Sequence, residues 1–193
     1  MSLYIGIDIA IGVGRESSWT AIVALSDMDD RPVYAERFKP EVNNFEKRLG
    51  DLGRFCYDSI AEACATTLQP VKGVLIAEPK MRGVTFNHKN KRTGLVTKVT
   101  ANLRSMFELA QARGAAVARL EVNGIKVYSM VESSMKKAFT NDGKADKIKV
   151  HRFAKLQWPN IPEKDYDFGD ATMVAEILKR RYKQLRHDRE FIH

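Results

Sequence analysis

Four acidic side chains stand where they could share hard cations. Asp8 interrupts an apolar run near the N-terminus, Glu78 closes a second one, and Asp167 and Asp170 lie three residues apart near the other end of the chain. A carboxylate inside an apolar strand is destabilising unless it is paired or binds a metal. Mg²⁺ and Mn²⁺ prefer oxygen ligands, and two such ions about 4 Å apart clamp the attacking and leaving oxygens of a phosphoryl displacement. The four acids together therefore predict a divalent-cation site for phosphodiester cleavage.

Each acid also has a structural interpretation. Asp167 or Asp170 fits a helix N-cap or an acid favoured by the helix dipole. Glu78, which precedes a proline, fits an exposed strand end. Asp8 has no such alternative, because caps and turns do not explain a carboxylate within a strand. It is therefore the strongest single indication of a metal site.

Five β-rich apolar runs and five helical stretches must position these acids. The strands are expected at residues 3–10, 19–25, 33–38, 71–77 and 125–130. The helices are expected from Asn43 or Asn44 to Pro70, then at about 99–119, 132–140, 144–157 and 168–187. Short links between the first three strands favour an antiparallel meander. The order of elements predicts an α/β fold with a mixed five-stranded sheet, three antiparallel leading strands and then two parallel ones, flanked by helices.

Size and composition exclude several classes of protein. With 193 residues, 44% of them hydrophobic, we expect a single domain over residues 1–193 with a packed core. No stretch approaches the ~20 apolar residues that span a bilayer, and the first residues do not resemble a signal peptide. Cys56 and Cys64 lie in one expected helix, about 12 Å apart along its axis, which is too far for a disulfide. We expect both to be core residues of a cytoplasmic protein without a membrane partner.

Basic residues are concentrated in the second part of the chain. The formal net charge is +8, to which residues 1–79 contribute −4 and residues 80–193 contribute +12. This excess predicts a polyanionic partner, the alternative being a basic surface that serves solubility alone. Cations also gather at the end of the last helix, and an aromatic side chain in a basic loop can stack on an unpaired base. The candidate DNA-binding residues of the basic insertion, at about 80–98, are Lys80, Arg82, Phe86, Lys89, Lys91 and Arg92.

Five short motifs occur in a defined order along the chain. They are Gly6-Ile7-Asp8, Ala77-Glu78-Pro79, Gln111-Ala112-Arg113-Gly114-Ala115-Ala116, Gly143-Lys144-Ala145-Asp146-Lys147 and Asp167-Phe168-Gly169-Asp170-Ala171. In this combination the chain resembles the RuvC-type Holliday junction resolvases, which are members of the RNase H-like superfamily. The resemblance runs from residue 4 to about residue 182.

The resemblance implies an Mg²⁺-dependent homodimeric endonuclease of DNA recombination and repair. Such an enzyme nicks two opposed strands of a four-way junction and leaves 5′-phosphate and 3′-hydroxyl ends. By position, Asp8, Glu78, Asp167 and Asp170 would be its catalytic acids and would hold two Mg²⁺ ions per active site, for which Mn²⁺ would substitute.

Lys147 and either Lys136 or Lys137 match the family's basic positions near the scissile phosphate, and the sequence leaves that second register open. Two features depart from the family. The first strand continues with Ile9-Ala10, where bacterial members usually have proline and glycine, and the segment between Glu78 and the helix that carries Gln111 is longer than in the bacterial enzymes. These departures favour a bacteriophage or other viral member, acting in a bacterial or phage-infected cell without a branch-migration motor as its partner.

Three alternatives remain open at this point. The first is a broader nuclease that cuts forks and flaps as well as four-way junctions. The second is a nucleotide-binding module of the actin and sugar-kinase type, which needs two lobes and a phosphate-binding loop that the sequence does not supply. The third is a catalytically silent DNA-binding protein of the same fold, against which the presence of all four acids argues.

Overall fold

The computed structural model describes residues 1–11, 19–29, 31–41, 44–78, 85–89, 96–100, 103–163 and 165–190. Its helices are α1 (Phe45–Thr67), α2 (Leu103–Val122), α3 (Glu132–Thr140), α4 (Lys147–Gln157) and α5 (Tyr166–Glu190). Its strands are β1 (Leu3–Asp8), β2 (Thr20–Ser26), β3 (Pro32–Phe38), β4 (Val71–Glu78), β5 (Thr85–Lys89), β6 (Val96–Thr100) and β7 (Val127–Val131). Within these ranges no helix is long and apolar enough to cross a membrane.

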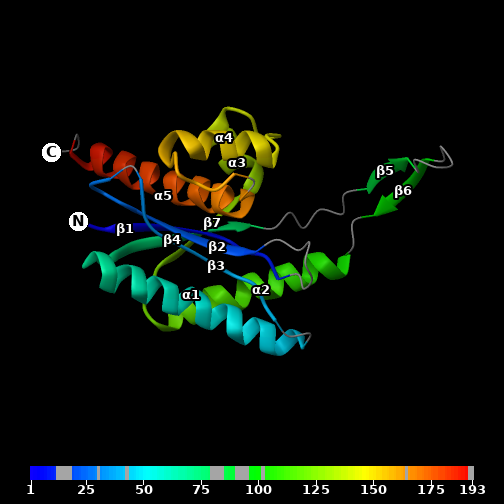
Figure 1. Ribbon diagram of the computed structural model, residues 1–193, viewed down its shortest axis with the longest axis horizontal. Coiled ribbons are helices and arrows are strands. Elements are labelled where there is room, and N and C mark those ends of the chain that lie inside the picture. The colour runs from blue at the N-terminus through cyan, green and yellow to red at the C-terminus, as the bar shows by residue number, and fades with distance from the viewer. Residues whose placement is uncertain are drawn as a thin grey trace.

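The central sheet has the strand order β3-β2-β1-β4-β7. The pairs β1–β2 and β2–β3 are antiparallel, whereas β1–β4 and β4–β7 are parallel. In Figure 1 helices α1 and α2 cover one face of this sheet, and α3, α4 and α5 lie on the other. The predicted α/β class, with its leading meander and mixed five-stranded sheet, is confirmed.

The side chains of β1 alternate between the two faces of the sheet, as the pleat of a strand requires. Leu3, Ile5 and Ile7 are fully buried in the core formed with α1 and α2. Tyr4 belongs to the core on the opposite side, with α4 and α5. By the same alternation Asp8 faces the α5 side, so the pleat directs its carboxylate toward the helix that carries two of the other acids.

Helix α5 packs very closely on the middle of the sheet because β1 has a glycine there. A Cβ atom built on Gly6 would lie 2.3 Å from both the carbonyl oxygen of Ala171 and the amide nitrogen of Ala175. Both alanines are fully buried. No larger residue at position 6 permits this approach, which fixes the height of α5 above β1 and hence the distance between their acids.

The basic insertion contains a feature that the sequence analysis did not predict. Strands β5 and β6 form a separate two-stranded antiparallel sheet, in which Phe86 pairs with Val99. The expected start of the second long helix at Val99 is therefore wrong, since this residue belongs to β6 and α2 begins at Leu103. Figure 1 shows the hairpin beyond the N-terminal end of α2 and apart from the central sheet.

One smaller expectation also needs correction. The first strand ends at Asp8 instead of continuing to residue 10, so this acid lies at the C-terminal end of the central strand. On α2, Ala112, Ala116 and Leu120 are fully buried, whereas Phe107 is 60% exposed. Small side chains on this face allow α1 and α2 to pack closely, as Gly53 does on the facing side of α1.

Candidate active site

The four predicted acids come from three elements that end or begin at one edge of the sheet. Asp8 is the last residue of β1 and Glu78 the last of β4, and these strands are parallel neighbours paired through Ile7 and Ile76. Asp167 and Asp170 lie in the first turns of α5. Since the carboxyl ends of parallel strands share an edge, the sheet itself brings Asp8 and Glu78 together, and the close approach of α5 adds the other two.

Three of the acids line one cavity of about 100 Å³. Asp8 and Asp170 are partly buried, whereas Glu78 is exposed. Apolar side chains form part of the lining, and its remaining charged residues come from α2 and from the start of α3. The residues that line it are Asp8, Ile9, Ala77, Glu78, Leu109, Arg113, Glu132, Met135, Asp170, Met173 and Val174.

Burial and mutual repulsion perturb two of these carboxyls. Burial, reinforced by the negative charge of Asp170, raises the pKa of Asp8 to about 8. Burial is also the main reason why the pKa of Asp170 rises to about 6, although Lys147 and Lys136 oppose the rise. At neutral pH the metal-free site therefore retains a proton, mainly on Asp8, that an ordinary aspartate would have lost, and a cation that binds there has to displace it.

Lys147, at the first position of α4, supplies a positive charge between the two acids of α5. Its Nζ lies 3.6 Å from Oδ1 of Asp167 and 3.7 Å from Oδ2 of Asp170. The pKa of Lys147 is raised, because attraction to Asp170, Asp8 and Asp167 outweighs the effect of burial. The structure thus places this predicted residue directly at the acidic cluster.

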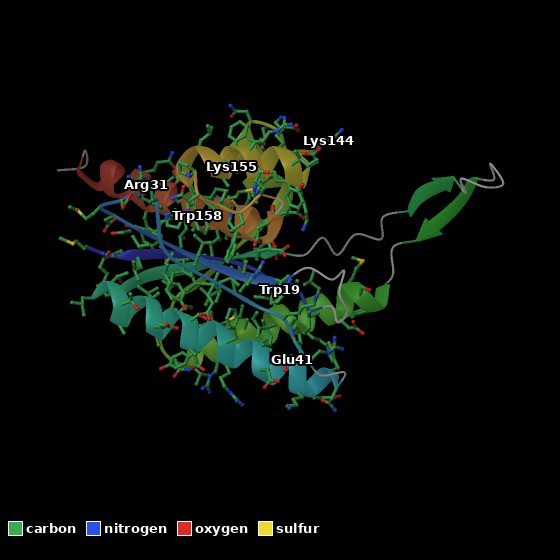
Figure 2. All side chains as sticks on the ribbon, in the orientation of Figure 1. Trp19, Arg31, Glu41, Lys144, Lys155 and Trp158 are labelled. Carbon is green, nitrogen blue, oxygen red and sulfur yellow. The ribbon has the colours of Figure 1, made fainter. Side chains whose placement is uncertain are left out.

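The main chain before β2 holds Asp167. The amide N–H of Trp19 donates a hydrogen bond of 2.9 Å to Oδ2 of Asp167, and Figure 2 shows Trp19 at the end of the sheet where β2 begins. The guanidinium of Arg37 lies over the Trp19 ring at 4.7 Å and forms a 2.7 Å ion pair with Asp165, just before α5. These contacts connect the start of α5 to strands β2 and β3.

Helix α3 presents only one of its two candidate lysines to the site. The side chain of Lys136 is 15% exposed, lies close enough to Asp170 to lower the pKa of that residue, and pairs with Glu132 at 2.6 Å. Lys137, by contrast, is exposed. Of the two registers that the sequence left open, the geometry therefore places Lys136 at the site.

Two residues of the cavity were absent from the predicted site. Glu132 directly follows β7, just as Glu78 ends the neighbouring β4, and the sequence contained this signal. Arg113 belongs to the Gln111–Ala116 motif, and its guanidinium donates a hydrogen bond to the hydroxyl of Ser129. Both add charge to a cavity that the sequence analysis had described through four acids alone.

The cavity supplies oxygen donors of the kind that bind divalent cations, but in this structure these donors lie too far apart to coordinate one ion together. Oδ1 of Asp170 is buried and has no hydrogen-bond partner within the described part of the chain. Oxygen from several carboxylates is the donor set that Mg²⁺ and Mn²⁺ prefer. In the same part of the chain, no three Asp, Glu, His or Cys side chains converge closely enough to hold an ion. The geometry thus supplies ligands that would have to move together on binding.

Most of the predicted DNA-binding residues of the insertion cannot be placed. Lys80, Arg82, Lys91 and Arg92 lie outside the described residues. The structure assigns the backbone of Phe86 and Lys89 to β5. Their roles in DNA binding remain predictions from the sequence.

Comparison with known proteins agrees with this geometry. Residues 93–177 match the family model described as crossover junction endodeoxyribonuclease RuvC. The fold resembles a solved structure titled T. thermophilus RuvC in complex with Holliday junction substrate, with a TM-score of 0.67 over 95% of both chains at 15% identity. A second Thermus thermophilus RuvC structure gives 0.60 over 96% of both chains at 16% identity. The resemblance to the RuvC family is confirmed.

Curated RuvC proteins are similar to part of this chain. The protein from Hyphomonas neptunium is 37% identical over 79 residues, which are 41% of this chain and 47% of that protein. The protein from Dichelobacter nodosus is 29% identical over 118 residues, which are 61% and 67% of the two chains. The matched segment thus spans about half the length of the first of these relatives. All named relatives are bacterial, so the predicted viral origin stays a prediction.

Proposed function

We propose that this chain is a structure-selective DNA endonuclease that resolves four-way junctions by hydrolysing phosphodiester bonds with two divalent metal ions. The observation that carries the proposal is the convergence of Asp8, Glu78 and Asp170 on one cavity, with Lys147 beside it. A protein that only binds DNA gains nothing from carboxylates at its phosphate-binding surface, because they repel the backbone.

The acids of the cavity would hold the ions, and Asp167, fixed by the amide of Trp19, would complete the ligand set. Bound there, Mg²⁺ or Mn²⁺ would supply the Lewis acid that activates water and stabilises the leaving oxygen. Because the pKa of Asp8 is raised to about 8 by burial, its carboxyl has to lose a proton before it can serve as a ligand near pH 7. A water molecule that attacked the phosphorus in line with the P–O3′ bond would break that bond, so that the 3′-oxygen leaves as a hydroxyl and the phosphate stays on the 5′ end.

Two lysines at the cavity would bind the scissile phosphate. Lys147 lies at its α5 side and Lys136 at its α3 side, so that their charges flank the acids. In this arrangement a phosphate neutralises cations that would otherwise compete for the carboxylates. The basic insertion at about 80–98, including the hairpin, would bind the arms of the branched DNA.

We propose further that the enzyme acts as a homodimer on cytoplasmic DNA. Two related cuts across a symmetric junction require two related active sites, which a twofold dimer supplies. The exposed Phe107 of α2 lies on the same helix as the cavity residues Leu109 and Arg113 and is a candidate for this contact. We propose as well that residues 1–193 form one nuclease domain and that the enzyme does not work with a branch-migration motor.

A cleavage assay tests the function directly. Labelled four-way junction, fork, flap and linear duplex are incubated with the protein in Mg²⁺, Mn²⁺ or EDTA. We expect paired nicks in the junction with either metal, none in EDTA, and none with Asp8→Asn, while Glu163→Gln, an exposed acid away from the cavity, cuts like the parent. Equal cutting of forks and flaps would favour a broader branched-DNA nuclease, and binding without any metal-dependent cutting would favour a silent DNA-binding protein.

A further inference from the structure

Glu132 brings a further carboxylate to the cavity at a place defined by the sheet. Strands β4 and β7 are parallel, and Glu78 pairs with Val131. Glu132 is the next residue along the chain and the first of α3, so it leaves the same sheet edge beside Glu78. It lines the cavity together with Asp8 and Asp170. Burial is the main cause of the raised pKa of both residues, and the negative charge of Glu132 adds a smaller contribution.

The two lysines at this site differ in what they contact. Lys147 lies between Asp167 and Asp170 and interacts with both at 3.6 to 3.7 Å. Lys136 instead forms a 2.6 Å ion pair with Glu132, one turn earlier on α3. Its side chain is largely buried, with 15% exposed, whereas that of Glu132 is 42% exposed. Lys136 is therefore held near Asp170 by a group that belongs to its own helix.

We propose that Glu132 is a positioning residue for Lys136, holding its ammonium at the α3 side of the cavity where it meets the scissile phosphate. This inference rests on the proposed nuclease function. Without Glu132, the nearest negative partners for a largely buried ammonium are the catalytic acids themselves. Lys136 would then join Lys147 in neutralising carboxylates that are needed for cations, and would be withdrawn from the phosphate.

The helix explains why this pair is well suited to the task. Residues four apart on a helix lie one above the other, and a glutamate that precedes its lysine has the favoured orientation. Met135, the preceding residue of α3, is fully buried against the core and fixes the rotation of the helix. The position of the ammonium is thus set by packing and by one ion pair, before any DNA is bound.

A double-mutant cycle on Glu132 and Lys136 tests the proposal. Glu132→Gln, Lys136→Gln and the double variant are compared with the parent in single-turnover cleavage of a saturating four-way junction. We expect Glu132→Gln to lower the maximal rate by about 10- to 100-fold, as for other misplaced electrostatic groups. In the Lys136→Gln background the same change should alter the rate by no more than about twofold, since the residue acts through the lysine.

Two further measurements separate positioning from other roles. The Mg²⁺ concentration that half-saturates thermal stabilisation should rise by no more than about fivefold in Glu132→Gln, because Lys136 then competes for the carboxylates while the ligands themselves are unchanged. Glu163→Gln removes another glutamate–lysine pair, with Lys155 at 3.3 Å, and should leave the rate unchanged. The double-mutant cycle is informative only if the parent protein cuts the junction. An inactive parent would overturn the proposed nuclease function, whereas with an active parent the cycle tests the role of Glu132 alone.

Three results would overturn the role of Glu132. The first is a parental rate in Glu132→Gln. The second is a loss of the same size in both backgrounds, which would mean that Glu132 acts independently of Lys136. The third is a large loss of Mg²⁺ affinity, which would make Glu132 a metal ligand instead of a positioning residue.

Discussion

Replacing Asp8 with asparagine is expected to stabilise the metal-free protein at alkaline pH while it abolishes cleavage. The pKa of this carboxyl rises from its ordinary 3.8 to about 8, mainly through burial and then through repulsion by Asp170. In the folded protein Asp8 therefore keeps its proton over a pH range in which the unfolded chain has lost it. Folding stability then falls as pH rises toward the folded pKa, because deprotonation favours the unfolded state.

The expected size of this effect follows from the shift. Each pKa unit corresponds to about 1.4 kcal/mol, so that between pH 6 and pH 8 a carboxyl with a folded pKa near 8 loses about 2 kcal/mol of unfolding free energy. Asparagine has nearly the same shape and no charge to desolvate. The variant should therefore lack this loss and be more stable than the parent at pH 8, although it is inactive.

Urea unfolding in EDTA, followed by tryptophan fluorescence at pH 6, 7 and 8, measures the difference. The parent and Asp8→Asn are compared with Glu163→Gln, whose carboxylate is exposed. Saturating Mg²⁺ at pH 8 should restore stability to the parent and leave Asp8→Asn unchanged, since bound cations compensate the ionised carboxylates. Parallel pH profiles of the parent and Asp8→Asn would refute the assignment of Asp8 as a buried, repelled carboxyl.

Other expectations concern the approach of α5, the charge between its acids and the insertion. Gly6→Ala should destabilise the protein by about 3 kcal/mol or more in chemical denaturation, because the new methyl group meets main-chain atoms at 2.3 Å, whereas Gly50→Ala, with open space in α1, should be neutral or stabilising. Lys147→Gln should raise the pKa of Asp170 further, move the pH–rate profile of Mg²⁺-dependent cutting to higher pH and lower its plateau by about 100-fold; an unshifted profile would contradict this. Phe86→Ala should slow junction cutting and leave Mg²⁺-induced thermal stabilisation intact, and unchanged single-turnover rates would dismiss its stacking on DNA.

The central sheet could be predicted from the sequence because its strands are apolar runs that are separated by recognisable turns and helices. The strand β1 is a good example, since every second residue enters one core and the glycine between them admits α5. The hairpin of β5 and β6 could not be found in the same way. Its few apolar residues are scattered in a segment rich in cations, so the charge pattern indicates a basic loop, and Val99 was assigned to the start of a helix.

The acids of the candidate active site illustrate a second limit of prediction from the sequence. Asp8 could be found from the sequence because a carboxylate among isoleucines is chemically conspicuous. Glu78 and the two acids of α5 could be added from their places at element ends. Glu132 occupies an equivalent place after β7, but an acid at a helix start has an ordinary explanation in the helix dipole. Only the register between β4 and β7, which joins Glu78 to Val131, distinguishes a cavity residue from a common helix start.

The same register explains why Lys136 and not Lys137 belongs to the site. Once α3 is known to begin at Glu132, the residue four positions later must lie above it on the same face, and the next residue is rotated away by about 100°. The position of Lys136 is therefore determined by where β7 ends and α3 begins, and that of Lys147 by where α4 begins. The cations of the cavity are thus placed by element boundaries, just as the acids are, and a change that moved α3 by one residue would exchange the buried lysine for the exposed one.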